Sequence, residues 1–361
     1  MKIFGKFLNS RDNSYKPLIF DFKKVNDLSK VRNLLKQKKI VNVVDEFSEQ
    51  LRELDLVKNP KLLTREPRKY GNDPKQGKWI YYSWQSSLVH VLEKDSYLRL
   101  KTSRNENLVL PSDQKKFAQF RIGIAGLNVG NPAAVCLALE GGGLEMKFAD
   151  NDVLSLTNFN RFRASITDLG LNKAVLSARQ VYEINPFAKI EVFRDGIKPD
   201  SLEEFLLKPR TDVLIEEMDN LRLKILIREK ARQYRIPVVM VTGNGPNVII
   251  DIERFDQNPE LPLLGGYLKQ SIIDIAKSDK LKTLPFKNKM LLARDFMGTK
   301  YLTQRLKKSF LLVGSKLAGI PQLAESSFLR GAVLCYLIRQ ISTGKKTPSG
   351  RYSLKLDSII Q

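Results

Sequence analysis

Acidic and basic side chains follow the apolar strand patterns in the middle of this 361-residue chain. Asp150 ends one such pattern, and Arg161, Lys173 and Asp219 follow further along. A carboxylate after a nucleotide-binding strand accepts hydrogen bonds from ribose hydroxyls, Arg and Lys neutralise phosphate oxygens, and a second carboxylate holds magnesium. The set therefore predicts an ATP site, with Asp150 on the ribose, Arg161 and Lys173 on the phosphates and Asp219 on magnesium.

The turn that precedes this set has the character of a phosphate-binding loop. Its sequence is GLNVGNP, with small residues at Gly126 and Gly130, where backbone N–H groups approach phosphate. Asn128 stands where the usual GxGxxG pattern has a glycine, and Pro132 suits the start of a helix. Asp150 follows Gly126 by 24 residues, close to the roughly 20 expected of a ribose-binding acid.

Two nucleotide-dependent chemistries compete for this region. An NAD(P) dehydrogenase would use the ribose acid, but nothing downstream is suited to hydride transfer. It would leave a set of polar side chains without a role: Asp152, Asn158, Asn160, Arg161, Lys173 and Asp219. A reaction on phosphate uses all of them. If the attacking group is a carboxylate, no general base is needed, because a carboxylate is already ionised at neutral pH.

The alternation of strand and helix patterns predicts an α/β fold. From residue 120 to residue 255 strands alternate with helices, so we expect a Rossmann-like, mostly parallel sheet with helices on both faces. Helices are expected at 44–56 and at 132–139, among others. We expect three parts: a smaller basic α+β region at 1–118, an ATP-binding domain at 119–258 and a mostly helical region at 259–361.

The order and spacing of the motifs resemble the superfamily of ThiF, MoeB and the ubiquitin-activating enzymes. Its members carry two acids one residue apart, then SNLNRQ, a lysine in GxxKA, INP, and a later Asp before Asn. The counterparts here are Asp150 and Asp152, TNFNRF at 157–162, GLNKA at 170–174, INP at 184–186 and Asp219-Asn220. The resemblance covers about residues 104–255 and implies ATP- and magnesium-dependent adenylation of a protein or peptide carboxylate, with release of pyrophosphate.

The resemblance also implies residue roles and a dimer. Family members send an arginine of an N-terminal element into the partner subunit's site, and Arg104 is its candidate counterpart, so the working unit is expected to be a homodimer. The expected catalytic residues are Arg161, Lys173, Asp219 and Arg104. The expected nucleotide-binding residues are Gly126, Asn128, Gly130, Asp150, Asp152, Asn158, Arg161 and Lys173, with Asn158 as a supporting contact.

The chain departs from many relatives in its cysteines. It has two, Cys136 and Cys335, and neither belongs to a CxxC pair of a zinc ribbon. Cys335 lies in an apolar helical pattern that would bury its thiol, where it is a poor nucleophile. We therefore expect a bacterial ThiF-family branch without the thioester cysteine, whose acyl-adenylate passes to another nucleophile. The branch shares flanking motifs with this chain, and similar enzymes modify peptide natural products.

The charge distribution concerns partners rather than catalysis. The formal net charge is +22, yet residues 120–265 carry 18 Lys+Arg and 20 Asp+Glu, which leaves 43 and 19 for the flanks. Basic flanks suit an acidic peptide, and nucleic acid is the less favoured partner. The alternative function is a catalytically inactive scaffold that binds an acidic protein or nucleic acid through these flanks.

Two further expectations come from what the sequence does not contain. No apolar run approaches the roughly 20 residues that span a bilayer, and the N-terminus lacks the apolar centre of a signal peptide, so we expect a cytoplasmic protein without a membrane partner. The single histidine, His90, lies in a strand pattern and is expected to be a satisfied structural residue.

Overall fold

The structure is a computed structural model that describes residues 13–64 and 69–359. The chain forms two compact units. The first comprises Met1–Pro111 and Ala178–Ala188, and the second comprises Ser112–Ser177 and Lys189–Gln361. The division falls inside helix α6 (Lys173–Ile184). Within the described part of the chain, no helix is both long enough and apolar enough to cross a membrane.

The first unit contains a four-stranded sheet with the order β1-β3-β4-β2. Its strands are β1 (Leu18–Phe20), β2 (Asn42–Val44), β3 (Lys78–Tyr82) and β4 (Ser87–Val91), and its helices include α1 (Val25–Lys36), α2 (Phe47–Lys58) and α3 (Lys94–Lys101). The expected helix at 44–56 is wrong at its start: Val44 pairs in parallel with Val89 in the sheet. Valine favours a strand because its branched side chain packs well on a pleated surface.

His90 is a structural residue of this sheet, as expected, and it is fully buried rather than half-buried. Its ring stacks between Phe47 and Trp79, at centroid distances of 4.1 and 4.3 Å. Nδ1 lies 2.9 Å from the Asp45 carboxylate and Nε2 lies 2.7 Å from the carbonyl of Gln76. Both ring nitrogens are thus satisfied within the first unit.

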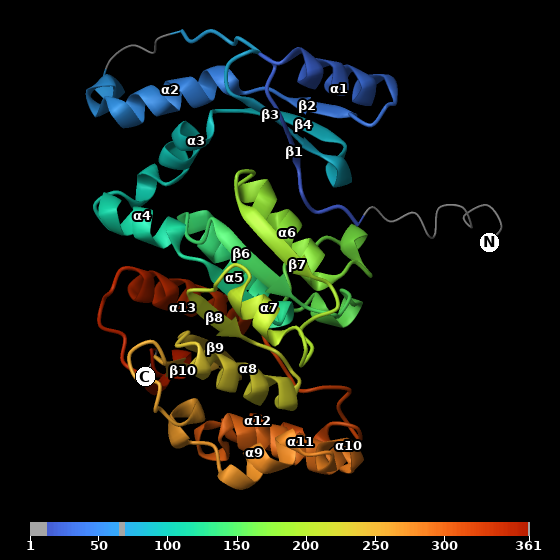
Figure 1. Cartoon of the computed structure of the whole chain (residues 1–361). Coiled ribbons are helices and arrows are strands. Elements are labelled where there is room, and N and C mark those ends of the chain that lie inside the picture. The colour runs from blue at the N-terminus through green and yellow to red at the C-terminus, as the bar shows by residue number, and fades with distance from the viewer. Residues whose placement is uncertain (1–12, 65–68, 360–361) are drawn as a thin grey trace, which may run out of the picture. The chain divides into compact units, whose positions relative to one another are not determined.

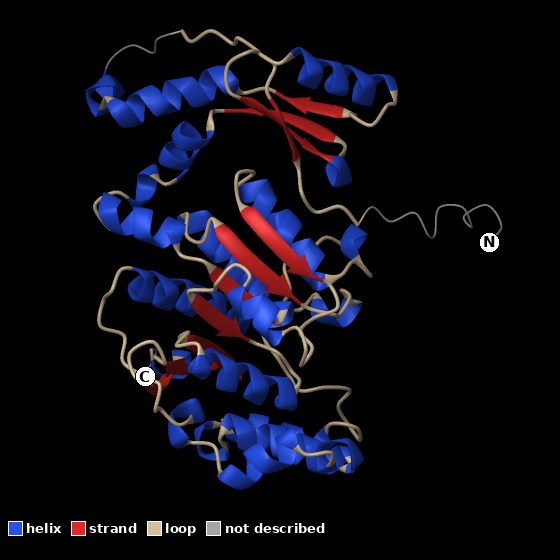
Figure 2. Cartoon of the chain, in the orientation of Figure 1, coloured by secondary structure: helices blue, strands red, loops and turns tan. Residues whose placement is uncertain are grey.

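The second unit is built on a seven-stranded sheet with the order β11-β10-β9-β8-β5-β6-β7 (Figures 1 and 2). The strands are β5 (Ile122–Ala125), β6 (Glu145–Ala149), β7 (Lys189–Phe193), β8 (Val213–Glu216), β9 (Val238–Asn244), β10 (Asn247–Glu253) and β11 (Gly350–Leu354). Strands β5 to β9 are parallel, and β10 and β11 add antiparallel pairs at one edge. The predicted α/β fold with a mostly parallel sheet is confirmed.

Helices cover both faces of this sheet. Helix α5 (Leu127–Glu140) packs against α13 (Ala324–Ser342), which also contacts β9. The approach is close, because a Cβ on Gly331 of α13 would lie 2.6 Å from Cβ of Pro132 on α5. A separate apolar cluster joins α7 (Leu202–Leu207), α8 (Leu221–Gln233), α9 (Gln270–Lys277) and α11 (Phe286–Met297). The remaining helices are α4 (Pro111–Gln119), α10 (Lys280–Thr283) and α12 (Gln304–Leu312).

The structure corrects one boundary that matters for the site. Helix α5 begins at Leu127, so the expected start at residue 132 is wrong, and Pro132 lies inside the helix. Pro132 has no N–H to donate to the carbonyl of Asn128, the i−4 residue, but its fixed φ is compatible with a helix near its start. The early start means that Gly126 alone makes the turn, and that the rest of the expected glycine turn, from Leu127 on, forms the beginning of α5.

Candidate active site

The candidate site lies where neighbouring parallel strands end at one edge of the sheet. In the register, Ala125 of β5 pairs with Ala149 of β6 and with Glu216 of β8. The chain therefore leaves the three strands at one level, through Gly126, Asp150 and Glu217. The strand order reverses direction at β5, because β6 and β8 lie on its two sides, and such switch points are where open α/β sheets bind ligands.

A cavity of about 240 Å³ opens at this edge within the second unit. Its lining includes five residues expected to be part of the site: Gly126, Asn128, Asp150, Asp152 and Asp219. We call it the nucleotide pocket. The turn into α5, the end of β6 and the end of β8 supply these residues, so segments almost a hundred residues apart in the chain meet here.

Gly126 makes the turn from β5 into α5. Its φ is +90°, and a Cβ at this position would lie 2.4 Å from the carbonyl oxygen of Glu217. Only glycine therefore fits without a shift of the backbone. Gly130, the other glycine of the expected turn, has a packing role instead. It packs α5 onto Ile124 of β5 and lines neither of the two cavities described in this unit.

Asp150 connects the strand end to the helix start. One carboxylate oxygen accepts the N–H of Leu127 at 2.6 Å, and the other accepts the N–H of Asp152 at 2.8 Å. Burial raises the pKa of Asp150, whereas these two hydrogen bonds and the nearby Lys173 oppose the rise. A carboxylate has about four lone-pair sites, so Asp150 keeps capacity to accept a hydroxyl in the pocket.

Lys173 is the first residue of α6 and is buried, with 4% of its surface exposed. Its Nζ donates to Asp152 Oδ2 at 2.9 Å, and its backbone N–H donates to the Asp152 carbonyl, also at 2.9 Å. An ammonium has three donors, so this ion pair leaves further donors for an anion. The structure thus brings Asp150, Asp152 and Lys173 together.

The loop at 155–162 holds the second expected cation. Asn158 is buried, and its side-chain oxygen accepts from the backbone and hydroxyl of Ser155, so it stabilises the loop. Arg161 is anchored through Nη1 to the carbonyl of Thr157 at 2.9 Å and to Asn160 Oδ1 at 2.8 Å. Burial lowers the pKa of Arg161, and the charge of Asp219 opposes the effect.

Two buried polar atoms at this site have no hydrogen-bond partner among the described residues. They are Nε of Arg161 and the side-chain oxygen of Asn128. Buried polar groups are rarely left unpaired, because each costs about 1–3 kcal/mol. A donor on a cation together with an acceptor at the glycine turn fits a ligand that carries phosphate and hydroxyl groups.

Asp219 is the acid best placed for a metal. It follows β8, is exposed, and accepts no hydrogen bond from the described residues. It lines the nucleotide pocket and also a second cavity, together with Asn128, Glu217 and Met218. One carboxylate fits magnesium, which keeps several waters and takes its other ligands from phosphate groups. The residues present therefore fit a magnesium–nucleotide complex.

The structure also shows where the remaining predicted residue lies. Arg104 belongs to a short 3-10 helix (Ser103–Asn105) in the first unit, and its side chain is exposed. Its expected role in a partner subunit's site stays a prediction.

Two buried charged residues at the site lie outside the expected set: Glu217, which was weighed from the sequence as an aid to the metal but left out, and Arg330, which the sequence reasoning missed. Glu217 lines both cavities, accepts the N–H of Val241 at 2.7 Å, and has its pKa raised to about 8 by burial. Arg330 of α13 lines the second cavity and is 4% exposed. Arg330 is the one charged residue of the otherwise apolar stretch 328–338, which was the available signal for it, and adjacency to Asp219 was the signal for Glu217.

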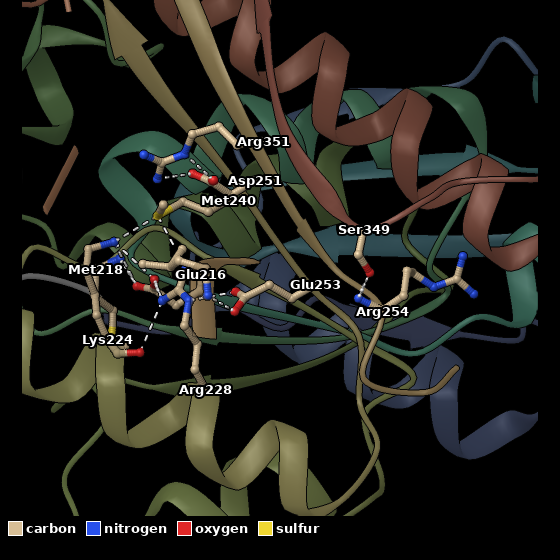
Figure 3. A network of polar contacts seen from close by, with 11 residues as sticks. Glu216, Met218, Lys224, Arg228, Met240, Asp251, Glu253, Arg254, Ser349 and Arg351 are labelled. Carbon is tan, nitrogen blue, oxygen red and sulfur yellow. Dashed lines mark hydrogen bonds and ion pairs between the residues drawn. The ribbon is translucent and has the colours of Figure 1, made fainter. Parts of the chain in front are cut away.

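Glu216, next to Glu217, belongs to a structural network instead (Figure 3). It is fully buried and pairs with Arg228 and with Lys224, whose Nζ lies 3.0 Å from Oε2. Arg228 continues to Glu253, with Nε 2.8 Å from Oε2. Burial alone would raise the pKa of Glu216, but the charges of Lys224 and Arg228 hold it below its usual value. These charges stabilise one another and leave none for a ligand.

The cysteines meet at the interface of α5 and α13. Cys335 is buried, as expected, and Cys136 is half-buried. Their sulfurs and a carboxylate oxygen of Glu140 lie within 4.8 Å of one another. None of these three residues lines the nucleotide pocket or the second cavity.

The fold and the pocket together define a Rossmann-like α/β protein with a cavity at the switch point of its sheet, the place where such sheets bind ligands. Residues 102–247 match the model of the ThiF family. The resemblance to the ThiF superfamily that the motifs predict is thereby confirmed for this region of the chain.

Three curated relatives extend the comparison. Uncharacterized protein MT1398 of Mycobacterium tuberculosis is 32% identical over 323 residues, which are 89% of this chain and 42% of that protein. The tRNA threonylcarbamoyladenosine dehydratase of Escherichia coli is 30% identical over 174 residues, 46% of this chain and 64% of that enzyme. A probable molybdopterin-synthase adenylyltransferase of Porphyra purpurea is 27% identical over 134 residues, 36% of this chain and 34% of the relative. The chain thus spans less than two thirds of each relative.

A solved structure shows the same fold. The E. coli tRNA N6-threonylcarbamoyladenosine dehydratase in complex with AMP superposes with a TM-score of 0.50 and 20% identity, over 70% of this chain and 98% of that one. At this identity the likeness concerns the fold alone.

Proposed function

We propose that the chain uses ATP and magnesium to adenylate a carboxylate. The carboxylate oxygen attacks the α-phosphorus, the bond to the bridging oxygen breaks, and pyrophosphate leaves as the acyl-adenylate forms. The observation that carries the proposal is the convergence of Asp150, Lys173 and Asp219 on one sheet edge, with an unpartnered Nε of Arg161 close by.

Each residue has a physical task in this reaction. Asp150 accepts a ribose hydroxyl, and the glycine turn lets backbone N–H groups approach the phosphates. Lys173 and Arg161 neutralise charge that moves onto the pyrophosphate. Asp219 would hold the magnesium ion, which adds further positive charge when bound. The attacking carboxylate is ionised at neutral pH, so the site needs no general base.

Calorimetric titration tests the nucleotide part of the proposal. We expect ATP with magnesium to bind, NADH not to bind, and both Asp219→Ala and Lys173→Ala to weaken ATP binding at least tenfold. Tight binding of NADH in place of ATP would favour a dehydrogenase. Salt-sensitive partner binding that survives both substitutions, without any ATP binding, would favour the scaffold function that the basic flanks suggest.

For the assembly we propose a homodimer in which Arg104 completes the partner's site. Mixing tests it: chains with Arg104→Ala and chains with Lys173→Ala are each inactive alone. If Arg104 acts across the dimer, mixed dimers regain one intact site and about a quarter to a half of the activity. No recovery, in a sample whose mass shows mixed dimers, would place Arg104 outside the partner's site. We also propose that the carboxylate belongs to a protein or peptide, such as the precursor of a peptide natural product.

A further inference from the structure

The second cavity, of about 170 Å³, is chemically different from the nucleotide pocket that it adjoins. Its wall is formed mainly by apolar side chains from the end of β8, α8, β9, α11 and the segment before α13: Met218, Leu221, Met240, Phe296, Met297 and Ile320. Such a wall favours an apolar group, and methionine side chains adapt their shape to one. We call this the acyl cavity.

One cation in the acyl cavity is buried without an ion pair. Arg330 is 4% exposed, and its hydrogen bonds are long: Nε donates to the Ser326 carbonyl at 3.3 Å and Nη2 donates to Gln322 Oε1 at 3.4 Å. Among the described residues no carboxylate lies within 4.0 Å of its guanidinium. A buried cation of this kind is costly until an anion joins it.

The other lysine or arginine that lines the cavity is already neutralised. Lys224 lies 3.0–3.1 Å from both oxygens of Glu216 and also contacts Met240 Sδ at 3.3 Å. Arg330 is therefore the cation of the described lining that is available to a ligand. Its charge also interacts with Glu217, Arg161 and Asp219, in that order of size, so the ligand anion would lie close to the proposed reaction centre.

A single available cation in a mainly apolar wall, which also carries the Glu217 and Asp219 carboxylates, matches a single carboxylate better than a triphosphate. A triphosphate carries several charges and needs several donors. The start of α5 lines the nucleotide pocket, and Lys173 and Arg161 interact with the lining residues Asp152 and Asp219. The acyl cavity offers one guanidinium, whose planar donors fit the two oxygens of a carboxylate. The apolar wall would then face whatever group the carboxylate carries.

We propose that the acyl cavity selects the substrate: Arg330 binds the reacting carboxylate, and the methionine-rich wall binds a bulky apolar group next to it. The substrate class is a chain whose terminal residue is apolar and larger than glycine, such as methionine or leucine. This inference rests on the proposed adenylation, since it assigns the substrate side of the same site.

Direct binding tests the inference separately from turnover. Wild-type protein with ATP and magnesium is titrated with N-acetyl-L-methionine and with N-acetylglycine. We expect the methionine derivative to bind at least tenfold more tightly, since a few buried methylenes contribute roughly 0.8 kcal/mol each. Equal affinity, or no binding of either acid at millimolar concentration, would overturn the inference. Failure of adenylation alone would show as binding without ATP–pyrophosphate exchange.

Variants separate the two ends of the cavity. Arg330→Gln should weaken N-acetyl-L-methionine binding at least tenfold and leave ATP affinity within threefold, and Arg330→Lys should restore part of the loss. A larger effect on ATP would instead make Arg330 a phosphate ligand and contradict the inference. Ala293→Leu adds bulk to the cavity wall, so it should reduce or reverse the preference for the methionine derivative. If the folded variant kept the same preference for the methionine derivative, the proposed role of the cavity wall in selecting the substrate would be contradicted.

Discussion

Two groups of buried charges in the second unit differ in how they are paired. Around Arg228, the carboxylates of Glu216 and Glu253 and the ammonium of Lys224 satisfy one another (Figure 3). At the site, Arg330 has no ion pair among the described residues, and Arg161 keeps an unpartnered Nε. Burial of charge is common to both groups. The pairing differs, and it separates a structural network from a candidate binding site.

The comparison has a physical basis. Breaking a buried ion pair leaves an uncompensated charge, whereas removing an unpaired buried charge removes a cost. The network around Arg228 should therefore respond to substitution mainly through stability. The site should respond mainly through ligand binding.

The largest effect is expected from Arg228→Met. It leaves Glu216 and Glu253 buried without their arginine, so the free energy of unfolding should fall by about 3–5 kcal/mol in urea denaturation. Arg330→Met is the matched control, because it changes the same residue type at a similarly buried position. We expect it to change the free energy of unfolding by less than about 1 kcal/mol. An equal cost for both would show that the two groups do not differ in kind.

Asp219→Asn tests the prediction that substitutions at the candidate site change activity and not stability. The exposed carboxylate holds no structural contact among the described residues, so stability should not change, whereas magnesium-dependent ATP–pyrophosphate exchange should fall on the order of 10²–10³-fold. Asp200→Asn, which removes another exposed carboxylate of the same unit, should leave exchange intact. Retained exchange in Asp219→Asn would remove this residue from the metal site.

Gly126→Ala tests how much stability depends on the close packing of the backbone at the candidate site. The added Cβ would lie 2.4 Å from the Glu217 carbonyl at a φ of +90°, so unfolding should become easier by roughly 1–3 kcal/mol. Gly319→Ala is the control, because a Cβ there meets nothing within 4 Å. Thermal denaturation compares the two, and an unchanged melting temperature for Gly126→Ala would contradict the close approach.

The smallest effect concerns a half-buried cation that can lose its proton, unlike an arginine. Burial lowers the pKa of Lys101, on α3 of the first unit, to about 8. Between about pH 8 and 10.5 the unfolded chain binds more protons at this residue than the folded chain, so stability should rise with pH in this window. Urea denaturation at several pH values should show the rise in wild type and in Lys94→Met, a change of an exposed lysine on the same helix. The same slope in Lys101→Met would contradict the assignment.

The sequence predicted those parts of the fold and site that depend on local patterns. The parallel strands followed from apolar runs, and the pocket residues Gly126, Asp150 and Asp219 followed from motifs at strand ends. The start of α5 did not, because Pro132 resembles a helix start although it lies inside the helix. The strand at Val44 was not predicted, because its pairing partner Val89 is distant in the chain and leaves no local signal.

The acyl cavity was outside the reach of sequence reasoning for a similar reason. Its lining combines α5, the end of β8, β9, α11 and α13, which share no motif, and Asn128 and Arg330 lie 202 residues apart in the chain. Arg330 could be distinguished from the paired Arg228 only when the positions of the carboxylates were known. Pairing is a property of tertiary structure, and the sequence holds no local signal for it.

A crystal structure of the chain with ATP and magnesium tests the central claim most directly. The account predicts the ribose at Asp150 in the nucleotide pocket, the phosphates near Lys173 and Arg161, and a magnesium ion at Asp219. A nucleotide bound elsewhere, or bound in this pocket with its phosphates directed away from these side chains, would contradict it.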